Sequence, residues 1–300
     1  MPRIRLRRSD PSRPGLTRRR YGRGFRYIDA DGAPVTDPAV LERIRALAIP
    51  PAWRDVWICP DERGHIQAIG TDAAGRRQYR YHDAWRETRD AAKHDRVLEV
   101  AQRLPALRKT VERHLARPTL DRERVLATAV RLLDLGMFRI GSESYAEQNG
   151  TYGLATLRRE HVCLRRGRIA FCYPAKSGQQ RVVEIEDAKV RPVLAALRRI
   201  QHDGDELLAY RCGRQWCDVR SNEINDYLKE VSGGVEITAK DFRTWHATVL
   251  MAVHLALGPP AETERARRKV VRAALEEVAH YLGNTPAVAE ASYVDPRIVT

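Results

Sequence analysis

The sequence contains few cysteines and no long apolar run. Only five of its 300 residues are cysteine, and no two of them are spaced as Cys-x-x-Cys, so we expect neither a disulfide framework nor a zinc site. No apolar stretch approaches the ~18 residues that a membrane-spanning helix needs, and the basic first residues lack the apolar segment of a secretory signal. These absences favour a protein that works in the reducing cytoplasm, away from the membrane.

Lysine and acidic residues are also scarce relative to arginine. The chain has 46 arginines and 7 lysines, and these 53 basic residues exceed the 39 acidic ones to give a formal net charge of +14. Such an excess favours a polyanionic partner, nucleic acid before an anionic membrane. Arginine suits phosphate because its guanidinium is forked and permanently charged, although a bias in genome base composition would enrich arginine equally well.

The first part of the chain has the pattern of short strands. Residues 1–20 are basic and predict a flexible arm, which either lies on DNA or is simply solvated. Beyond this arm, alternation and turn residues predict strands in "GFRYIDADG", "RDVWICPD", "HIQAIGTD" and "RRQYRYHD". One short helix is indicated in "TDPAVLERIRALAIPP", with Asp37 as its N-cap and Pro50-Pro51 as its stop.

Helical periodicity takes over near Trp85. Amphipathic helices are predicted in "DAWRETRDAAKHDRVLEVAQRL", "DRERVLATAVRLLDLG" and four later segments. Between them, three strands are expected near residues 161–165, 168–173 and 181–186. The predicted fold class is therefore α+β, with a small β-rich domain over residues 1–88 and a larger, mainly helical domain over residues 89–300 that contains a three-stranded β island.

Two residues are conspicuous by their position. Tyr293 stands seven residues from the C-terminus among small and polar residues, where it either docks a short terminal helix or presents its hydroxyl on a mobile end. Lys176 lies in "PAKSGQQ", at the tip of a predicted hairpin. There it is either a solvated turn residue or a functional group displayed on a rigid frame.

One predicted strand, "GRRQYRYH", interleaves cationic and aromatic residues. Because side chains alternate along a strand, Tyr79 and Tyr81 share one face. Gln78 has the donor and acceptor that reading a base edge requires. The strand is therefore a candidate DNA contact, and the alternative is that its tyrosines fill a small core.

Several segments together resemble the type IB DNA topoisomerases, and most closely the compact poxviral and bacterial branch. The segments that carry the resemblance are "LGMFRIGSESYAEQNGTYGLATLRREHV", "YPAKSGQQ", "KDFRTWHATVLMA" and "YLGNTPAVAEASYVDPR". The earlier stretch "IPPAWRDVWICPDERGHIQAIGTDAAGRRQYRYHDAWR" is similar to the DNA-clamping domain of that branch. The resemblance covers nearly all of the chain after about residue 20, and its motifs occur in the family's order and spacing.

The resemblance implies a set of catalytic residues. Tyr293 would be the nucleophile that joins the 3′ phosphate of the cut strand, and Lys176 would be the general acid that protonates the departing 5′ oxygen. Arg139 and Arg243 would be the two catalytic arginines, and Asn284 would donate to a non-bridging phosphate oxygen. Many family members have histidine at this last position, as the viral ones do, whereas bacterial members share asparagine.

These roles agree with the chemistry of the side chains. A phenol with a pKa near ~10 is a poor nucleophile unless its surroundings favour the phenolate. Phosphoryl transfer places charge on the equatorial oxygens, which forked guanidinium groups can bind in pairs. An arginine cannot give up a proton at neutral pH, so proton delivery needs the lysine. Asn284 donates a hydrogen bond but does not titrate, and its alternative role is to cap the helix that begins near Pro286.

The resemblance also implies DNA contacts outside the catalytic set: Gln78, Tyr79, Tyr81, Tyr145 and Lys240. Neighbouring residues are given structural roles. Asp241 is expected to hold an arginine or a helix start, and Trp245 and His246 are expected to belong to the core or to support the site.

The sequence thus predicts a monomeric type IB topoisomerase of the cytoplasm, associated with the nucleoid. It would clamp duplex DNA, cut one strand transiently, and reseal it. Neither association with a membrane nor an obligate protein partner is expected. The phosphotyrosyl bond retains the energy for resealing, so no ATP is needed. No glycine-rich nucleotide-binding motif and no set of metal ligands is visible in the sequence, so no cofactor and no metal are expected.

Two alternatives remain at this point. A tyrosine site-specific recombinase uses the same covalent chemistry, but it typically has His-x-x-Arg before its second arginine, where this chain has Lys240-Asp241-Phe242-Arg243. A non-catalytic basic DNA-binding protein would need no covalent adduct, and Tyr293 would be dispensable in it.

Overall fold

The computed structural model describes residues 5–200 and 204–299, except for the side chains of residues 90, 91, 144, 145 and 177. The chain divides into two compact units, Met1–His94 and Asp95–Thr300, and each is described here by itself. Among the described residues, no helix is both long and apolar enough to cross a membrane.

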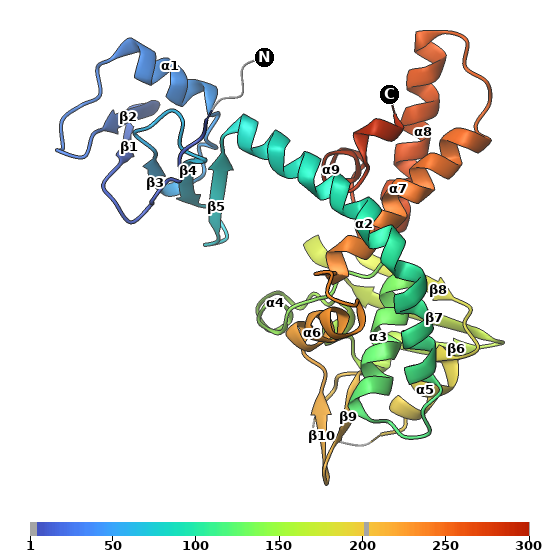
Figure 1. Cartoon of the computed structure of the whole chain (residues 1–300). Coiled ribbons are helices and arrows are strands. Elements are labelled where there is room, and N and C mark those ends of the chain that lie inside the picture. The colour runs from blue at the N-terminus through green and yellow to red at the C-terminus, as the bar shows by residue number, and fades with distance from the viewer. Residues whose placement is uncertain (1–4, 201–203, 300) are drawn as a thin grey trace. The chain divides into compact units, whose positions relative to one another are not determined.

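The N-terminal unit is an antiparallel sheet of five strands with one short helix (Figure 1). The strand order is β2-β1-β3-β4-β5. The strands are β1 (Leu16–Tyr21), β2 (Gly24–Ile28), β3 (Arg54–Ile58), β4 (Ile66–Thr71) and β5 (Arg77–Tyr81). Helix α1 (Pro38–Ala46) begins as predicted, because the Asp37 carboxylate accepts a hydrogen bond from the Ala39 amide at 2.8 Å. Its core is small and includes Ile44 and Ile58, which are both buried.

The predicted flexible arm is largely wrong. Residues 16–21 of this basic stretch form β1, which pairs with both β2 and β3. Leu16 is buried in the core of the unit, and the Arg18 guanidinium donates to the carbonyls of Ile49, Pro50 and Trp53. These hydrogen bonds satisfy a charged side chain that the sequence analysis expected to be solvated. The basic stretch therefore contains a strand that its run of arginines did not indicate.

The C-terminal unit is mainly helical (Figure 1). Its helices are α2 (Asp83–Leu115, which begins in the first unit), α3 (Arg122–Gly136), α4 (Glu143–Asn149), α5 (Val190–Leu197), α6 (Ser221–Val231), α7 (Ala239–Leu257), α8 (Glu264–Leu282) and α9 (Pro286–Ser292). Helix α2 continues through Pro105, beyond the predicted segment. Leu107, Val111 and Leu115 are all buried. Their packing stabilises a stretch that proline would otherwise interrupt.

The predicted three-stranded β island is confirmed. Strands β6 (Val162–Arg165), β7 (Arg168–Pro174) and β8 (Gln180–Ile185) form an antiparallel sheet in that order. A tight turn at Arg166-Gly167 joins β6 to β7, with positive φ at both residues. The α+β fold class, with a β-rich first part and a mainly helical second part, is therefore confirmed.

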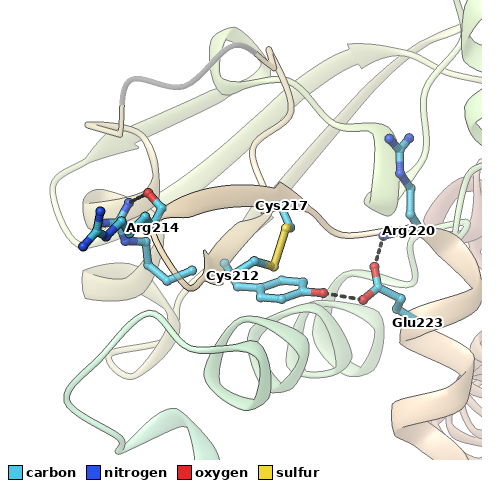
Figure 2. The surroundings of a disulfide bond; sticks show 7 residues. Cys212, Arg214, Cys217, Arg220 and Glu223 are labelled. Atoms are coloured by element: carbon cyan, nitrogen blue, oxygen red, sulfur yellow. Dashed lines mark hydrogen bonds between the residues drawn. A yellow bond between two sulfur atoms is a disulfide. The ribbon is translucent and has the colours of Figure 1, made fainter.

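A second hairpin and a disulfide were not expected. Strands β9 (Ala209–Cys212) and β10 (Gln215–Asp218) pair antiparallel, and a disulfide joins Cys212 to Cys217, whose Cα atoms are 6.0 Å apart (Figure 2). The chain reverses at Gly213, where φ is +61°, and this turn brings together two cysteines that are five residues apart. The expectation of no disulfide was therefore wrong, and the cysteine content does not support a reducing compartment.

Candidate active site

The C-terminal end of α8 is the centre of the site. Gly283 follows the helix with φ at +61°. Its amide donates to the His280 carbonyl at 3.1 Å, and the Asn284 amide donates to the Ala279 carbonyl at 2.9 Å. This pair of bonds is the Schellman turn that commonly ends a helix. It leaves the last carbonyls, those of residues 281–283, without partners inside the helix.

Three arginines bind these three consecutive carbonyls. Arg181 of β8 donates to the Tyr281 oxygen at 2.7 Å, and Arg243 of α7 donates to the Leu282 oxygen at 2.9 Å. Arg139, from the segment between α3 and α4, donates to the Gly283 oxygen at 3.1 Å. Cations are favoured at a helix C-terminus because the macrodipole is negative there. The end of α8 therefore gathers three guanidinium groups from three different parts of the unit.

Arg243 is held in a buried position. Only 3% of its surface is exposed, and its Nη1 atom also donates to the carbonyl of Met137, which ends α3 in a left-handed conformation with φ at +50°. Burial lowers the pKa of Arg243 from its ordinary value, an effect that the nearby Tyr293 opposes. Its Nε atom is buried and has no hydrogen-bond partner among the described residues.

Arg139 is positioned by a close approach of two glycines. A Cβ atom on Gly141 would lie 2.9 Å from the Cα atom of Gly153, so neither residue tolerates a side chain there. The contact lets the Leu154 amide donate to the Arg139 carbonyl at 2.8 Å. Both glycines belong to the motif that carried the family resemblance, and their spacing fixes the backbone of the arginine.

Tyr293 lies directly against this cluster. It follows α9, it is partly buried, and the Arg243 Cζ atom is 5.0 Å from the centre of its ring. Burial raises the pKa of the Tyr293 hydroxyl, but its interactions with Arg243, together with the charges of Arg139 and Lys240, outweigh burial and place the pKa below its ordinary value of 10.0. A lowered pKa makes the phenolate, the nucleophilic form, easier to reach.

The chain around Tyr293 is anchored. The Thr248 hydroxyl of α7 donates to the Tyr293 carbonyl at 3.2 Å and accepts from the Asp295 amide at 3.2 Å. Val294 and Asp295 are buried, and the Arg297 guanidinium donates to the Asp295 carboxylate. Of the two interpretations of this tyrosine, the docked terminal helix agrees with these contacts of the backbone, and the mobile chain end does not.

Asn284 is beside Arg139 and does not cap α9. Its Oδ1 atom accepts a hydrogen bond from the Arg139 guanidinium. The capping residue is Thr285, whose hydroxyl accepts from the Val288 amide at 3.4 Å. The Asn284 Nδ2 atom is buried and has no hydrogen-bond partner among the described residues.

Lys176 and Lys240 are both exposed. Lys176 begins a short 3-10 turn, η3 (Lys176–Gly178), between β7 and β8, as the hairpin prediction required. In the part of the chain that the structure describes, no recorded hydrogen bond or ion pair joins Lys176 to Tyr293, Arg139, Arg243 or Asn284. Lys240, in the first turn of α7, is close enough to Tyr293 to contribute to its lowered pKa.

The predicted DNA-contact strand belongs to the other unit. The rings of Tyr79 and Tyr81 stack at 6.1 Å between centroids, so these two side chains lie on one face of β5. Gln78 donates to the Asp72 carboxylate at 2.9 Å. The side chain of Tyr145, a further predicted contact, lies outside the described residues.

The structural roles expected near Arg243 are present. The Asp241 carboxylate accepts from the amide and hydroxyl of Thr238, which caps α7, and it pairs with Arg96 at 3.3 Å. His246 hydrogen-bonds to the buried Asp134 at 3.0 Å. Sequence reasoning missed Arg181, for which the only signal is its place on the strand that follows the Lys176 loop.

The described residues contain no group of three or more histidine, cysteine or acidic side chains that could hold a metal ion.

Comparison with known proteins identifies the family. Residues 82–296 match the model of the eukaryotic DNA topoisomerase I catalytic core, and residues 24–72 match the N-terminal domain of bacterial DNA topoisomerase IB. DNA topoisomerase 1B of Acanthamoeba polyphaga mimivirus is 31% identical over 288 residues, which cover 93% of this chain and 85% of that protein. DNA topoisomerase 1B of Vaccinia virus (strain Copenhagen) is 22% identical over 244 residues, 77% of this chain and 70% of that one.

Structural similarity adds little. A post-cleavage complex of the XerH site-specific recombinase with its difH substrate superposes with a TM-score of 0.39 and 14% identity, over 63% of this chain and 48% of that one, which is too distant to carry an argument. The family models and the viral relatives span the chain much more completely. On their account, the chain belongs to the type IB DNA topoisomerases, in the compact viral and bacterial branch, and is a type I topoisomerase enzyme.

Proposed function

We propose that this enzyme relaxes supercoiled duplex DNA by a transient break in one strand, with Tyr293 as the nucleophile and without ATP or metal. The observation that carries the proposal is the contact of Tyr293 with the buried Arg243, whose charge, with those of Arg139 and Lys240, lowers the pKa of the tyrosine. A tyrosine made more acidic by fixed cations is the group that attack on a phosphodiester needs.

The steps assign one role to each residue. The Tyr293 hydroxyl loses its proton to water, and its phenolate oxygen attacks phosphorus and forms the 3′-phosphotyrosyl bond while the bond from phosphorus to the 5′ oxygen breaks. Lys176 gives a proton to the departing 5′ oxygen, and resealing runs the same steps in reverse. Arg139 and Arg243 stabilise the charge on the non-bridging oxygens, and the unpaired Nδ2 donor of Asn284 reaches one of the same oxygens.

We propose further assignments beyond the catalytic steps. The net charge of +14 supports duplex DNA as partner, and the family resemblance supports a nucleoid location in the cytoplasm and action as a monomer. Gln78, Tyr79, Tyr81, Tyr145 and Lys240 would contact DNA. The first 88 residues would form the clamping domain and residues 89–300 the catalytic domain. The division into compact units lies a few residues later, between His94 and Asp95.

The first test is relaxation of supercoiled plasmid in EDTA without ATP. The purified enzyme should change the linking number, and detergent should trap protein on the 3′ end of the cut strand. Tyr293→Phe should bind DNA but neither relax it nor form the adduct. Relaxation by Tyr293→Phe would exclude this nucleophile, complete loss of activity in EDTA would exclude the metal-free mechanism, and joining of two DNA sites would indicate a recombinase.

The second test isolates the general acid. Lys176→Ala should slow cleavage by roughly 10²–10⁴-fold, the usual scale of general acid catalysis. In a substrate with sulfur in place of the 5′ bridging oxygen, the 5′ end leaves as a thiolate and needs no proton. This substrate should therefore restore cleavage by Lys176→Ala but not by Tyr293→Phe. Lys189→Ala is the matched control, because Lys189 is an exposed lysine of the same unit that pairs with Glu112. If sulfur gives no rescue, Lys176 is not the acid.

A further inference from the structure

We propose that Arg181, to which no motif assigned a role, is a positioning residue for strand cleavage. It would tie the β7–β8 hairpin, which carries Lys176 at its tip, to the Schellman turn at the end of α8, which carries Asn284. The inference rests on the proposed function, since it concerns the alignment of residues assigned there.

The contacts of Arg181 join the two parts directly. From β8, its Nη2 atom donates to the Tyr281 carbonyl at 2.7 Å. Its Nη1 atom lies so close to Gly283 that a Cβ atom at that residue would collide with it. The charge of its guanidinium also interacts with the side chain of Tyr173, a residue of β7 that is 1% exposed. Arg181 is thus held between the sheet and the helix end.

The position of the turn decides where the other site residues lie. The Leu282 and Gly283 carbonyls that follow Tyr281 orient Arg243 and Arg139, and the next residue, Asn284, accepts from Arg139. Moving the turn relative to β8 would therefore shift two guanidinium groups and an amide together. Misplacement of catalytic groups by about 1 Å can cost roughly 10²-fold in rate.

Arg181 differs from the two catalytic arginines in what it binds. The hydrogen bond described for its guanidinium goes to a protein oxygen, the Tyr281 carbonyl, and its charge interacts with the Tyr173 side chain. The positive charge of Arg139 is near enough to Arg181 to contribute to lowering its pKa. The carbonyl dipoles at the helix end offset the repulsion between the two arginines. The geometry therefore suits alignment of the site and not capture of the phosphate.

The experiment separates alignment from DNA binding. Single-turnover cleavage of a duplex that cannot be resealed is measured at saturating enzyme, below the melting temperature of every variant, and DNA affinity is measured separately. Arg181→Ala should slow cleavage by roughly 10²-fold with DNA affinity unchanged, and Arg181→Lys, which keeps one donor for the Tyr281 carbonyl, should recover part of the rate. Arg168→Ala is the matched control, because Arg168 is an exposed arginine of the same sheet that pairs with Glu184 and Glu186.

A double variant tests the route. If Arg181 acts through the turn, Arg181→Ala should slow cleavage by a smaller factor in the Asn284→Ala background than in the wild type, because one of the three groups that the turn places is already absent. The proposal would be overturned if the losses of cleavage rate in the double variant were multiplicative, or if Arg181→Ala cleaved at the wild-type rate. It would also be overturned if weakened DNA binding accounted for the loss of rate. If Arg181→Ala does not fold, Arg181→Lys provides the same comparison. Failure of the wild-type enzyme to cleave would instead refute the proposed function.

Discussion

At the scale of single residues, Asp134 shows how a buried charge supports the site. Its carboxylate accepts two hydrogen bonds from Arg108 of α2, at 2.8 and 2.9 Å, and one contact of 3.0 Å joins it to His246 of α7. Asp134 is itself in α3, three residues before Met137, whose carbonyl binds Arg243. The network therefore connects the helices on which Arg243 depends.

We predict that Asp134→Asn lowers stability in a pH-dependent way. Burial raises the pKa of Asp134, but the hydrogen bonds from His246 and Arg108 outweigh it and lower the pKa from 3.8 to about 2. A lowered pKa stabilises the fold above pH 4, and this contribution disappears as the pH falls from about 4 to about 2. At pH 7 the variant should lose about 2 kcal/mol of unfolding free energy in urea titrations. The difference from wild type should shrink at pH 3, and a constant difference would contradict the linkage.

Site residues were predictable where a motif surrounds them. Tyr293, Arg139 and Arg243 were singled out by their flanking residues, and the structure brings them together with Asn284. Arg181 was not, for a physical reason. It is one of 46 arginines, and its main partner on α8 is a main-chain carbonyl, which any residue at position 281 would supply.

At the scale of elements, the β9–β10 hairpin combines a disulfide with packing at its base. The Tyr210 hydroxyl donates to the Glu223 carboxylate at 2.7 Å (Figure 2). The Arg211 amide donates to the Leu120 carbonyl at 3.1 Å. None of the proposed catalytic residues lies in this hairpin. Its stability can therefore be changed without touching the site.

We predict that reduction of the Cys212–Cys217 bond lowers stability and leaves cleavage unchanged. Closing so short a loop contributes about 2 kcal/mol in the chain-entropy model, so urea denaturation with reductant should show a loss of that order. The double variant Cys212→Ser/Cys217→Ser should show the same loss without reductant and no further loss with it. A slower cleavage step on reduction would mean that the hairpin reaches the site.

Elements were predictable where burial alternates with exposure. The β island follows that pattern, and its strands were placed to within a residue or two. Strand β1 was missed because three arginines occupy consecutive positions in it. The β9–β10 hairpin was missed because its strands are only four residues each, too few for a period to stand out.

At the scale of the whole molecule, the net charge of +14 predicts steep salt dependence. Each phosphate neutralised adds about −0.9 to the slope of log affinity against log salt. Measured with Tyr293→Phe to prevent cleavage, the affinity for duplex DNA should fall linearly on these axes. Adding Lys240→Ala should reduce the slope by about 1, and Lys109→Ala, at an exposed position of α2, should leave it unchanged. A slope near zero would contradict electrostatic binding.

The carbonyls that hold the three arginines have one more consequence. In the part of the chain that the structure describes, none of Arg139, Arg181 and Arg243 pairs with a carboxylate. An arriving phosphate therefore displaces no competing anion from Arg139 or Arg243, and these two cations keep their full attraction for it. The same feature exposes the enzyme to small oxyanions. Sulfate or inorganic phosphate can occupy such a cluster, and its inhibition would then exceed that of chloride at equal ionic strength.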